Sequence, residues 1–328
     1  MKEFEDDLRR KLKILSDIIW DGKGRKSTLD QWLDNFTEDD FKVNILYLLT
    51  HFIYFNKIQV TEMLKSLYRD LYRYPILSKI RIENGNSFDS KIIEPLFNVE
   101  LSKTRFVGLG GAGESATHLL YPFGHINDIH PDYLINYKEI KDILKEDKKV
   151  DNFIFIDDLA GSGTQAKKYL KDLLTELKIE YPNISFTYMV LICTTKALNT
   201  LEELGIFKEV KAVYLLDDSF KAFDDKSRFY ANENNPSFID LEATKKYSGE
   251  YGKPLYNFIW EVKEGLDTVK ANSMADRDKL GFKRGELLLG FHHNTPSNTL
   301  PIIWFNEKEL PWIPIFPRFN KVYKKPAV

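Results

Sequence analysis

The sequence predicts a doubly wound α/β fold built around a mostly parallel sheet. From about residue 103 onward, short apolar and β-branched runs alternate with stretches of helical periodicity, which is the pattern of strands joined by crossover helices. The runs expected to form strands are TRFVGLG, NFIFIDD, SFTYMVLICTT, VKAVYLLDD and GELLLGFHH. Helices are expected between them, over residues 115–121, 164–179 and 198–204.

A helical region precedes this pattern. Up to about residue 74, apolar side chains recur at helical spacing, as in Leu46, Leu49 and Ile53. We therefore expect residues 1–78 to form a helical N-terminal region and residues 79–328 to form the α/β domain.

Two segments of the expected α/β domain depart from the alternation of strands and helices. Residues 219–274 are polar and weakly periodic, and so long an excursion before the last strands predicts a lid or insertion. Residues 300–328 carry several prolines among aromatic side chains. Because proline fixes its backbone angle and lacks an amide proton, we expect this tail to run extended over the surface.

Composition and charge exclude several classes of protein. The chain has 328 residues, and its 47 basic and 49 acidic side chains leave a net charge of -2, so no overall field attracts nucleic acid or an anionic membrane. A single cysteine, Cys193, excludes a disulfide within the chain and favours a cytoplasmic protein. No segment has the pattern of a secretory signal or the apolar length of a membrane span.

The segment FIFIDDLAGSGT, residues 153–164, carries the most informative pattern. A predicted strand runs into Asp157 and Asp158, which places two carboxylates at the carboxyl edge of the sheet, where open α/β folds bind ligands. The small residues that follow offer backbone amides and hydroxyl groups to an anion, with a helix N-terminus behind them. Carboxylates accept hydrogen bonds from sugar hydroxyls, so a ribose 5-phosphate is the simplest ligand that matches both halves. The alternative is a surface turn with a capping Ser or Thr.

This segment resembles the phosphoribosyl pyrophosphate motif of the type I phosphoribosyltransferases, in which four apolar residues, two acids and a small loop occur in the same order. The resemblance implies a phosphoribosyltransferase type of fold, with Asp157 and Asp158 holding the ribose hydroxyls. It implies a 5′-phosphate loop made of Ala160, Gly161, Ser162, Gly163, Thr164 and Gln165. It also implies Mg²⁺ bound through the ligand, with the two acids as candidate metal contacts, and no organic cofactor.

A second glycine-rich turn, GLGGAGES, follows the first predicted strand of the α/β domain. It satisfies the spacing of a dinucleotide fingerprint, but no convincing second strand ends in an acid about 20 residues later, as that fold requires. In the phosphoribosyltransferase interpretation, the same turn resembles the pyrophosphate loop, whose candidate residues are Gly110, Gly111, Ala112, Gly113 and Glu114. Because this turn has no Lys or Arg, pyrophosphate would be held by amides and metal alone.

Other polar residues are candidates for contacts with the base or for a lid. Asp217 and Asp218 end a predicted strand at the same rim, and Arg228 follows in the predicted lid. His292 and Asn294 lie in the segment HHNTPSNTLPIIW, which is equally consistent with a simple loop between apolar strands. For Asp217 and Asp218 the alternative is a role at the start of a loop.

The layout of the whole chain is similar to that of phosphoribosyltransferase-like proteins encoded in bacterial conflict loci, including some retron defence cassettes. This resemblance implies an antiviral effector controlled by partner proteins of the cassette, with a reverse transcriptase complex as a candidate. The chain is also a candidate homo-oligomer. Three hypotheses follow: an enzyme that is a phosphoribosyltransferase or hydrolyses the glycosidic bond of nucleotides, a non-catalytic sensor of nucleotide or phosphoribosyl pyrophosphate, and an interaction subunit. The sequence shows no strong signal for direct nucleic-acid binding and no membrane segment.

Overall fold

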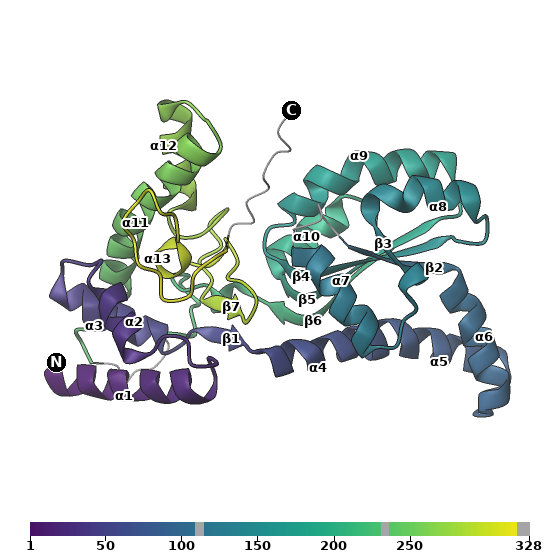
Figure 1. Cartoon of the computed structure of the whole chain (residues 1–328), viewed down its shortest axis with the longest axis horizontal. Helices are drawn as coiled ribbons and strands as arrows, with labels where there is room; N and C mark the ends of the chain where they lie inside the picture. The colour runs from purple at the N-terminus through teal and green to yellow at the C-terminus, as the bar shows by residue number, and fades with distance from the viewer. Residues whose placement is uncertain (109–114, 231–235, 320–328) are drawn as a thin grey trace. The chain divides into compact units, whose positions relative to one another are not determined.

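The computed structural model describes residues 1–108, 115–230 and 236–319, without the side chains of residues 115–118 (Figure 1). The chain divides into two compact units. The first comprises Met1–Ile58 and Asp217–Asn320, and the described part of the second is Gln59–Leu216.

The second unit is an α/β structure with one parallel sheet. Its strands are β2 (Thr104–Gly108), β3 (Leu134–Asn136), β4 (Asn152–Ala160), β5 (Ser185–Thr194) and β6 (Glu209–Leu216). Its longer helices are α4 (Lys57–Tyr68), α5 (Tyr74–Glu83), α6 (Ser90–Ser102), α7 (Ser115–Ile126), α8 (Ile140–Glu146), α9 (Thr164–Glu180) and α10 (Thr195–Glu203). A π-helical segment (Arg69–Arg73) joins α4 to α5, and two short 3₁₀ turns (Pro131–Tyr133 and Tyr137–Glu139) flank β3.

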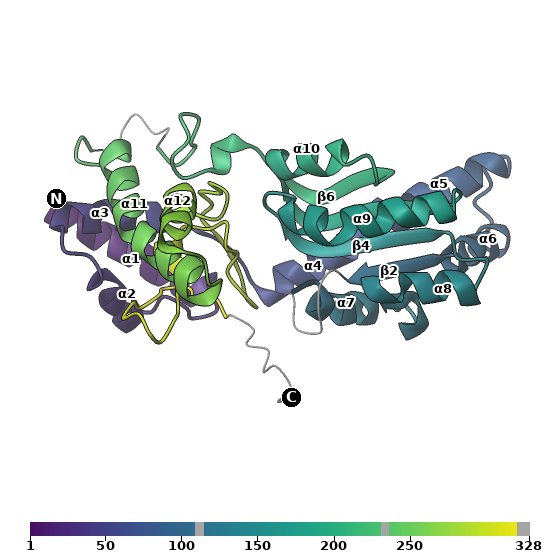
Figure 2. The same cartoon turned by 90° about the horizontal axis from the view of Figure 1, so that it is seen from above.

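The strand order is β3-β2-β4-β5-β6, with all neighbours parallel, and it can be followed from β6 through β4 to β2 in Figure 2. This is a doubly wound order, and the direction of winding reverses between β2 and β4. Ligands of open α/β sheets bind outside the carboxyl ends of the strands at such a reversal. The predicted α/β class and parallel sheet are therefore confirmed.

Helices cover both faces of the sheet, with α8 and α9 on one side and α4 and α5 on the other (Figure 1). On the first face, side chains of β4 and β5 such as Phe155 and Val190 form a buried cluster with α8, α9 and α10. On the other face, Phe106 of β2 packs against Tyr72 and Phe123, with ring centroids 5.0 and 5.1 Å apart. Because both faces are covered, the central strands β4 and β5 are largely buried and read as nearly continuous apolar runs.

The first unit combines helices from both ends of the chain. Its elements are α1 (Lys2–Ile18), α2 (Lys26–Leu33), α3 (Asp39–Leu49), β1 (Ile53–Phe55), α11 (Leu241–Phe258), α12 (Thr268–Asp278), β7 (Leu289–Phe291) and α13 (Pro301–Trp304), with a 3₁₀ turn (Asp218–Phe220) and a π-helical segment (Ile259–Lys263). β1 pairs in parallel with β7, and Trp32 Nε1 donates to the carbonyl of Ile302 at 2.8 Å. The N-terminal helices and the last third of the chain therefore share one core.

This division differs from the boundary expected at residue 78. Helices α4, α5 and α6 belong with the sheet, whereas α1, α2 and α3 need residues from the end of the chain to bury their apolar faces. The run GELLLGFHH does not join the main sheet, because its strand β7 pairs with β1. The fifth strand of the main sheet is the three-residue β3, which the sequence pattern did not identify.

Two further segments differ from expectation. Residues 219–274, expected to form a lid or insertion, contain α11 and part of α12, and buried Leu255, Tyr256 and Ala271 show that these helices pack into the interior of the first unit. The tail beyond residue 300 has little regular structure, but Trp304 and Phe316 are buried and do not lie on the surface. Among the described residues, no helix combines the length and apolar character needed to cross a membrane.

Candidate functional site

The acid pair lies at the carboxyl end of β4, beside the point where the sheet reverses its winding. β2 ends at Gly108, which is paired with Ile156, whereas β4 continues to Ala160. Asp157 and Asp158 therefore lie just beyond the end of the neighbouring strand. This is the position at which open α/β sheets bind their ligands.

Asp157 is buried and held by two hydrogen bonds. Its side chain is 4% exposed, the Tyr188 hydroxyl donates to its Oδ2 at 2.7 Å, and the amide of Asp158 donates to its Oδ1 at 3.0 Å. Burial, followed by the neighbouring charge of Asp158, raises the pKa of Asp157 well above its usual range, and the hydrogen bond from Tyr188 opposes this rise. Asp157 is thus anchored inside the protein.

Asp158 is more accessible than Asp157. It is partly exposed, and its Oδ1 accepts a hydrogen bond from the amide of Leu159 at 2.8 Å. The pair therefore combines one carboxylate fixed in the interior with one that a ligand could reach. Such unequal environments are typical of paired acids that serve different purposes.

The loop after the acids leads directly into helix α9. Gly163 is the N-cap residue and has a φ of 68°, and a Cβ at this position would lie 2.9 Å from Thr200 Cγ2, so the turn requires glycine. The Ser162 hydroxyl donates to Thr164 Oγ1 at 3.0 Å. Among the described residues, no acceptor is found for the amides of Gly161, Ser162 and Gly163. These amides and the positive end of α9 are suited to bind an anion.

The loop is also fixed from the neighbouring strand. Thr194, at the end of β5, donates its hydroxyl to the carbonyl of Gly161 at 2.9 Å. The same Oγ1 accepts from the amide of Ala197 at 3.1 Å and caps α10. Thr194 thus connects the loop to the N-terminus of α10.

The model of one family, PRTase-CE, matches residues 29–318. The chain belongs to the PRTase-CE family. The match covers both units and includes the acid pair and its loop, so it supports a phosphoribosyltransferase-like protein. No curated protein and no solved structure matches the chain.

The remaining residues predicted for the site of this PRTase-CE protein have varied positions. Gly110, Gly111, Ala112, Gly113 and Glu114 lie outside the described residues. Gly108, the last described residue before them, ends β2 next to β4 at the winding reversal.

Asp217, Asp218 and Arg228 make local contacts in the first unit. Asp217 accepts from the amide of Ser219 at 3.0 Å and caps a short 3₁₀ turn, while Asp218 pairs with Lys221 at 2.6 Å. The Arg228 guanidinium stacks over the ring of Phe220 at 3.4 Å from its centroid. These contacts stabilise the loop that leaves β6.

His292 and Asn294 also belong to the first unit. Burial, with smaller contributions from neighbouring cations, lowers the pKa of His292 to about 4, so its imidazole is neutral at physiological pH. Asn294 Oδ1 accepts from the amides of Thr295 and Phe319 at 2.9 and 3.1 Å. Both residues therefore hold a polar turn inside their own unit, and the acid pair belongs to the other unit.

The acid pair fits Mg²⁺ only in combination with a ligand. Within the part of the chain that the structure describes, no group of three or more His, Cys, Asp or Glu side chains could hold a metal ion. Both oxygens of Asp157 already accept hydrogen bonds, which leaves Asp158 as the accessible carboxylate. Since Mg²⁺ commonly binds one or two carboxylates together with substrate phosphates, this arrangement is compatible with the ion.

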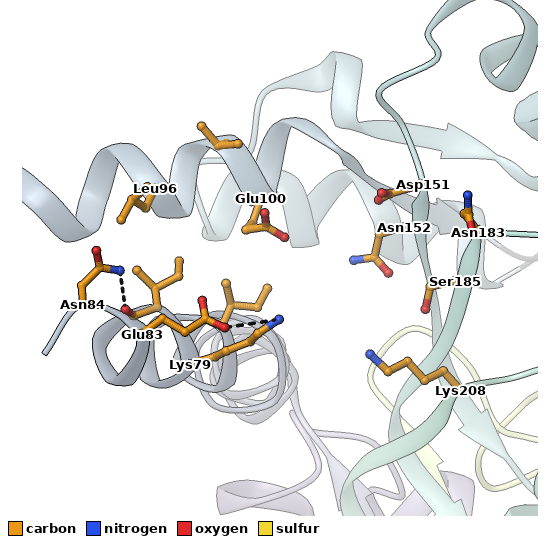
Figure 3. Close-up of a pocket in the computed structure, with 13 residues that line it drawn as sticks. Lys79, Glu83, Asn84, Leu96, Glu100, Asp151, Asn152, Asn183, Ser185 and Lys208 are labelled. Atoms are coloured by element: carbon orange, nitrogen blue, oxygen red, sulfur yellow. Dashed lines mark hydrogen bonds and ion pairs between the residues drawn. The ribbon is translucent and has the colours of Figure 1, made fainter. Parts of the chain in front are cut away.

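A cavity of about 420 Å³ lies at the opposite, amino edge of the sheet (Figure 3). It is bounded by α5, α6 and the first residues of β4 and β5, Asn152 and Ser185. In Figure 3, Lys208 extends from the strand side, while Lys79 and Glu83 lie on α5. This cavity is therefore distinct from the edge that carries the acid pair.

Two residues of the site, Tyr188 and Thr194, were not predicted from the sequence. Tyr188 reaches Asp157 because the register pairs Phe155 with Tyr188 and Asp157 with Val190. Thr194 reaches the loop because β5 ends beside it. A polar residue within an apolar strand is a signal for the first, but the strand register that gives it a partner is not visible in the sequence.

Proposed function

We propose that this chain is a phosphoribosyltransferase-like effector that binds a ribose 5-phosphate ligand, either phosphoribosyl pyrophosphate or a nucleotide. The observation that carries the proposal is the position of the acid pair and the amide-lined loop together at the carboxyl end of β4, beside the winding reversal. Membership of the PRTase-CE family supports the same ligand class.

The roles of the residues follow from their surroundings. Asp158 would accept hydrogen bonds from the ribose hydroxyls, because it is the accessible carboxylate. The amides of Gly161, Ser162 and Gly163 would donate to the 5′-phosphate at the positive end of α9. Asp157, fixed by Tyr188, would position the end of the strand, and Asp158 would carry the negative charge near the sugar.

The reaction class is transfer or hydrolysis at C1′ of the ribose. Positive charge develops on the sugar ring as the bond to the leaving group breaks, and nearby carboxylates stabilise that charge. When bound, Mg²⁺ would neutralise charge on the leaving group. The chain would hold the ligand in position and place the carboxylate of Asp158 near the charge that develops on the sugar.

A non-catalytic sensor is the second candidate. It is favoured by the glycine-rich segment after β2, whose sequence GLGGAGES contains no Lys or Arg to hold pyrophosphate. Release of pyrophosphate or of free base from bound nucleotide distinguishes the enzyme from the sensor. Binding without turnover would favour the sensor.

Antiviral defence under the control of partner proteins is the biological part of the proposal, and the similarity of the chain's layout to conflict-system proteins supports it. Phage challenge of cells that express the chain with its neighbouring genes tests this part. Equal plating on cells with wild-type chain and with the Asp157→Asn/Asp158→Asn variant would contradict it.

The ligand is tested by calorimetric titration of the full chain with phosphoribosyl pyrophosphate and Mg²⁺. Asp158→Asn should weaken binding by roughly tenfold or more, because hydrogen bonds to a charged group contribute about 1.5–3 kcal/mol. Asp142→Asn, an exposed acid on α8, is the matched control and should bind like wild type. Absence of heat with the wild type, or equal affinity of both variants, would contradict the proposal.

A further inference from the structure

A second cavity lies in the first unit, between α1 and the turn that leads into α2. Its volume is about 630 Å³, within the range of small-molecule sites. Its floor is buried and small or apolar, formed by Ser16, Gly24 and Leu29. The rim is charged and consists of Asp6, Arg9, Arg10, Lys13, Asp17, Arg25 and Lys26.

The rim carries five cations and two acids. Arg9 pairs with Glu5 and Asp30, both at 2.8 Å, Arg10 pairs with Asp7, and Lys13 pairs with Asp17 at 3.0 Å. Among the described residues, no acid forms an ion pair with Arg25 or Lys26. These two cations therefore give the cavity an excess of positive charge on the α2 side.

The start of α2 adds to this positive field. Lys26 is its first residue and Arg25 its N-cap, no side chain caps it, and its first turn has no acid. Across the described chain, no acceptor is found for the amides of Lys26, Ser27 and Thr28. Cations at the positive end of a helix are unfavourable unless an anion accompanies them. The turn is therefore poised to bind an anion.

The floor supplies an independent indication of a ligand. Ser16 is 1% exposed, and its hydroxyl has no hydrogen-bond partner within the described residues. A buried hydroxyl without a partner costs free energy, and a ligand atom in the cavity would supply the missing acceptor.

The backbone of the turn brings these groups together. Gly24 has a φ of 69°, and a Cβ there would lie 3.3 Å from the ring of Trp20, so the chain passes tightly over that buried side chain. This turn places Arg25 and Lys26 at the rim of the cavity that Ser16 lines from α1.

We propose that this cavity binds an organic phosphate of nucleotide size. Its phosphate groups would contact Arg25, Lys26 and the first amides of α2, with the Ser16 hydroxyl donating to the same ligand. The aliphatic stems of the rim and Leu29 would cover the apolar part, and arginine planes stack well on bases. The site lies entirely in the first unit and does not depend on the function proposed for the acid pair.

The test is calorimetric titration with ATP of the full chain carrying Asp157→Asn/Asp158→Asn, because the acid pair is itself proposed to bind nucleotides. Removal of the two charges in Arg25→Gln/Lys26→Gln should weaken binding roughly tenfold or more, since each charge-assisted hydrogen bond contributes over a kcal/mol. Ser16→Ala should weaken binding about threefold to tenfold and leave thermal stability equal or higher, because it removes an unsatisfied buried hydroxyl. A purely structural role of Ser16 would lower stability without changing affinity.

Two control variants test whether ATP binding depends on this cavity alone. Lys145→Gln/Lys149→Gln removes the same charge from exposed positions near α8 and should leave affinity unchanged. The Asp157→Asn/Asp158→Asn background should itself bind ATP, which separates the cavity from the acid pair. Loss of affinity in either control, or its retention in Arg25→Gln/Lys26→Gln, would overturn the assignment.

A second titration with a 20-nucleotide single-stranded DNA distinguishes a free nucleotide from a phosphodiester backbone. The proposal predicts that ATP binds at least as tightly as the 20-nucleotide DNA does. Binding of the strand without binding of ATP, with a steep dependence on salt, would overturn the small-molecule assignment in favour of a nucleic acid. No binding of either probe would overturn the site itself.

Discussion

The hydrogen bond between Tyr188 and Asp157 gives the sharpest test of the structure around the acid pair. The two oxygens are 2.7 Å apart, and both side chains are almost fully buried. Tyr188→Phe removes the donor and leaves a buried carboxyl without it. We expect a loss of unfolding free energy on the order of 1.5–3 kcal/mol when the carboxylate is charged, and about 1 kcal/mol when it is protonated.

The loss should depend on pH in a defined direction. Removal of a hydrogen bond that favours the charged form raises the pKa of Asp157 further in the folded state. The destabilisation should therefore be smallest at acid pH and should grow as the pH rises through the folded pKa of Asp157. Urea denaturation of wild type and variant from pH 5 to pH 9, read by far-UV circular dichroism, measures this difference.

Tyr72→Phe is the matched control in the same unit. Tyr72 is also buried, but its hydroxyl donates at 3.0 Å to the neutral hydroxyl of Thr104, so its loss should not vary with pH in this range. A destabilisation of Tyr188→Phe that stays constant with pH, or equals zero, would refute the role of the Tyr188 bond.

Three further substitutions probe the acid pair and its loop. Gly163→Ala should lower stability by about 1–2 kcal/mol, because its positive φ and the contact with Thr200 oppose a side chain, and equilibrium denaturation measures this loss. Thr194→Val should lower the free energy of unfolding by about 1 kcal/mol, because the cap of α10 is lost. It should also weaken phosphoribosyl pyrophosphate binding, because the hydrogen bond to Gly161 is lost. Unchanged affinity in calorimetry would argue against a link between this bond and the ligand. Because the pKa of Asp157 is raised in the folded state, the stability of the wild type should fall as the pH rises from the unfolded pKa through the folded one. Asp157→Asn should lack this fall, and a variant whose stability falls with pH in parallel with the wild type would contradict the expectation.

The sequence predicts the central strands of the sheet because their chemistry is local. The run that ends at Asp157 is apolar, β-branched or aromatic throughout and is followed by a glycine-rich turn, so its strand, loop and helix could all be placed. The short β3 was missed because three residues, Leu134–Asn136, carry too little pattern to stand out from a loop.

The assembly of the first unit depends on long-range contacts that periodicity does not contain. β1 and β7 are over 200 residues apart in sequence and pair through a register set only in the folded chain. Burial of Trp304 and Phe316 likewise follows from the surface that the N-terminal helices offer them. The proline-rich tail therefore looked like a surface segment, although its aromatic side chains fill a core.

The central claim is that the acid pair and the loop before α9 form one site for a ribose 5-phosphate. A crystal structure of the chain with ribose 5-phosphate tests it most directly. We expect the phosphate on the amides of Gly161, Ser162 and Gly163, and the ribose hydroxyls on Asp158. A sugar phosphate bound elsewhere, with these amides facing only water, would contradict the claim.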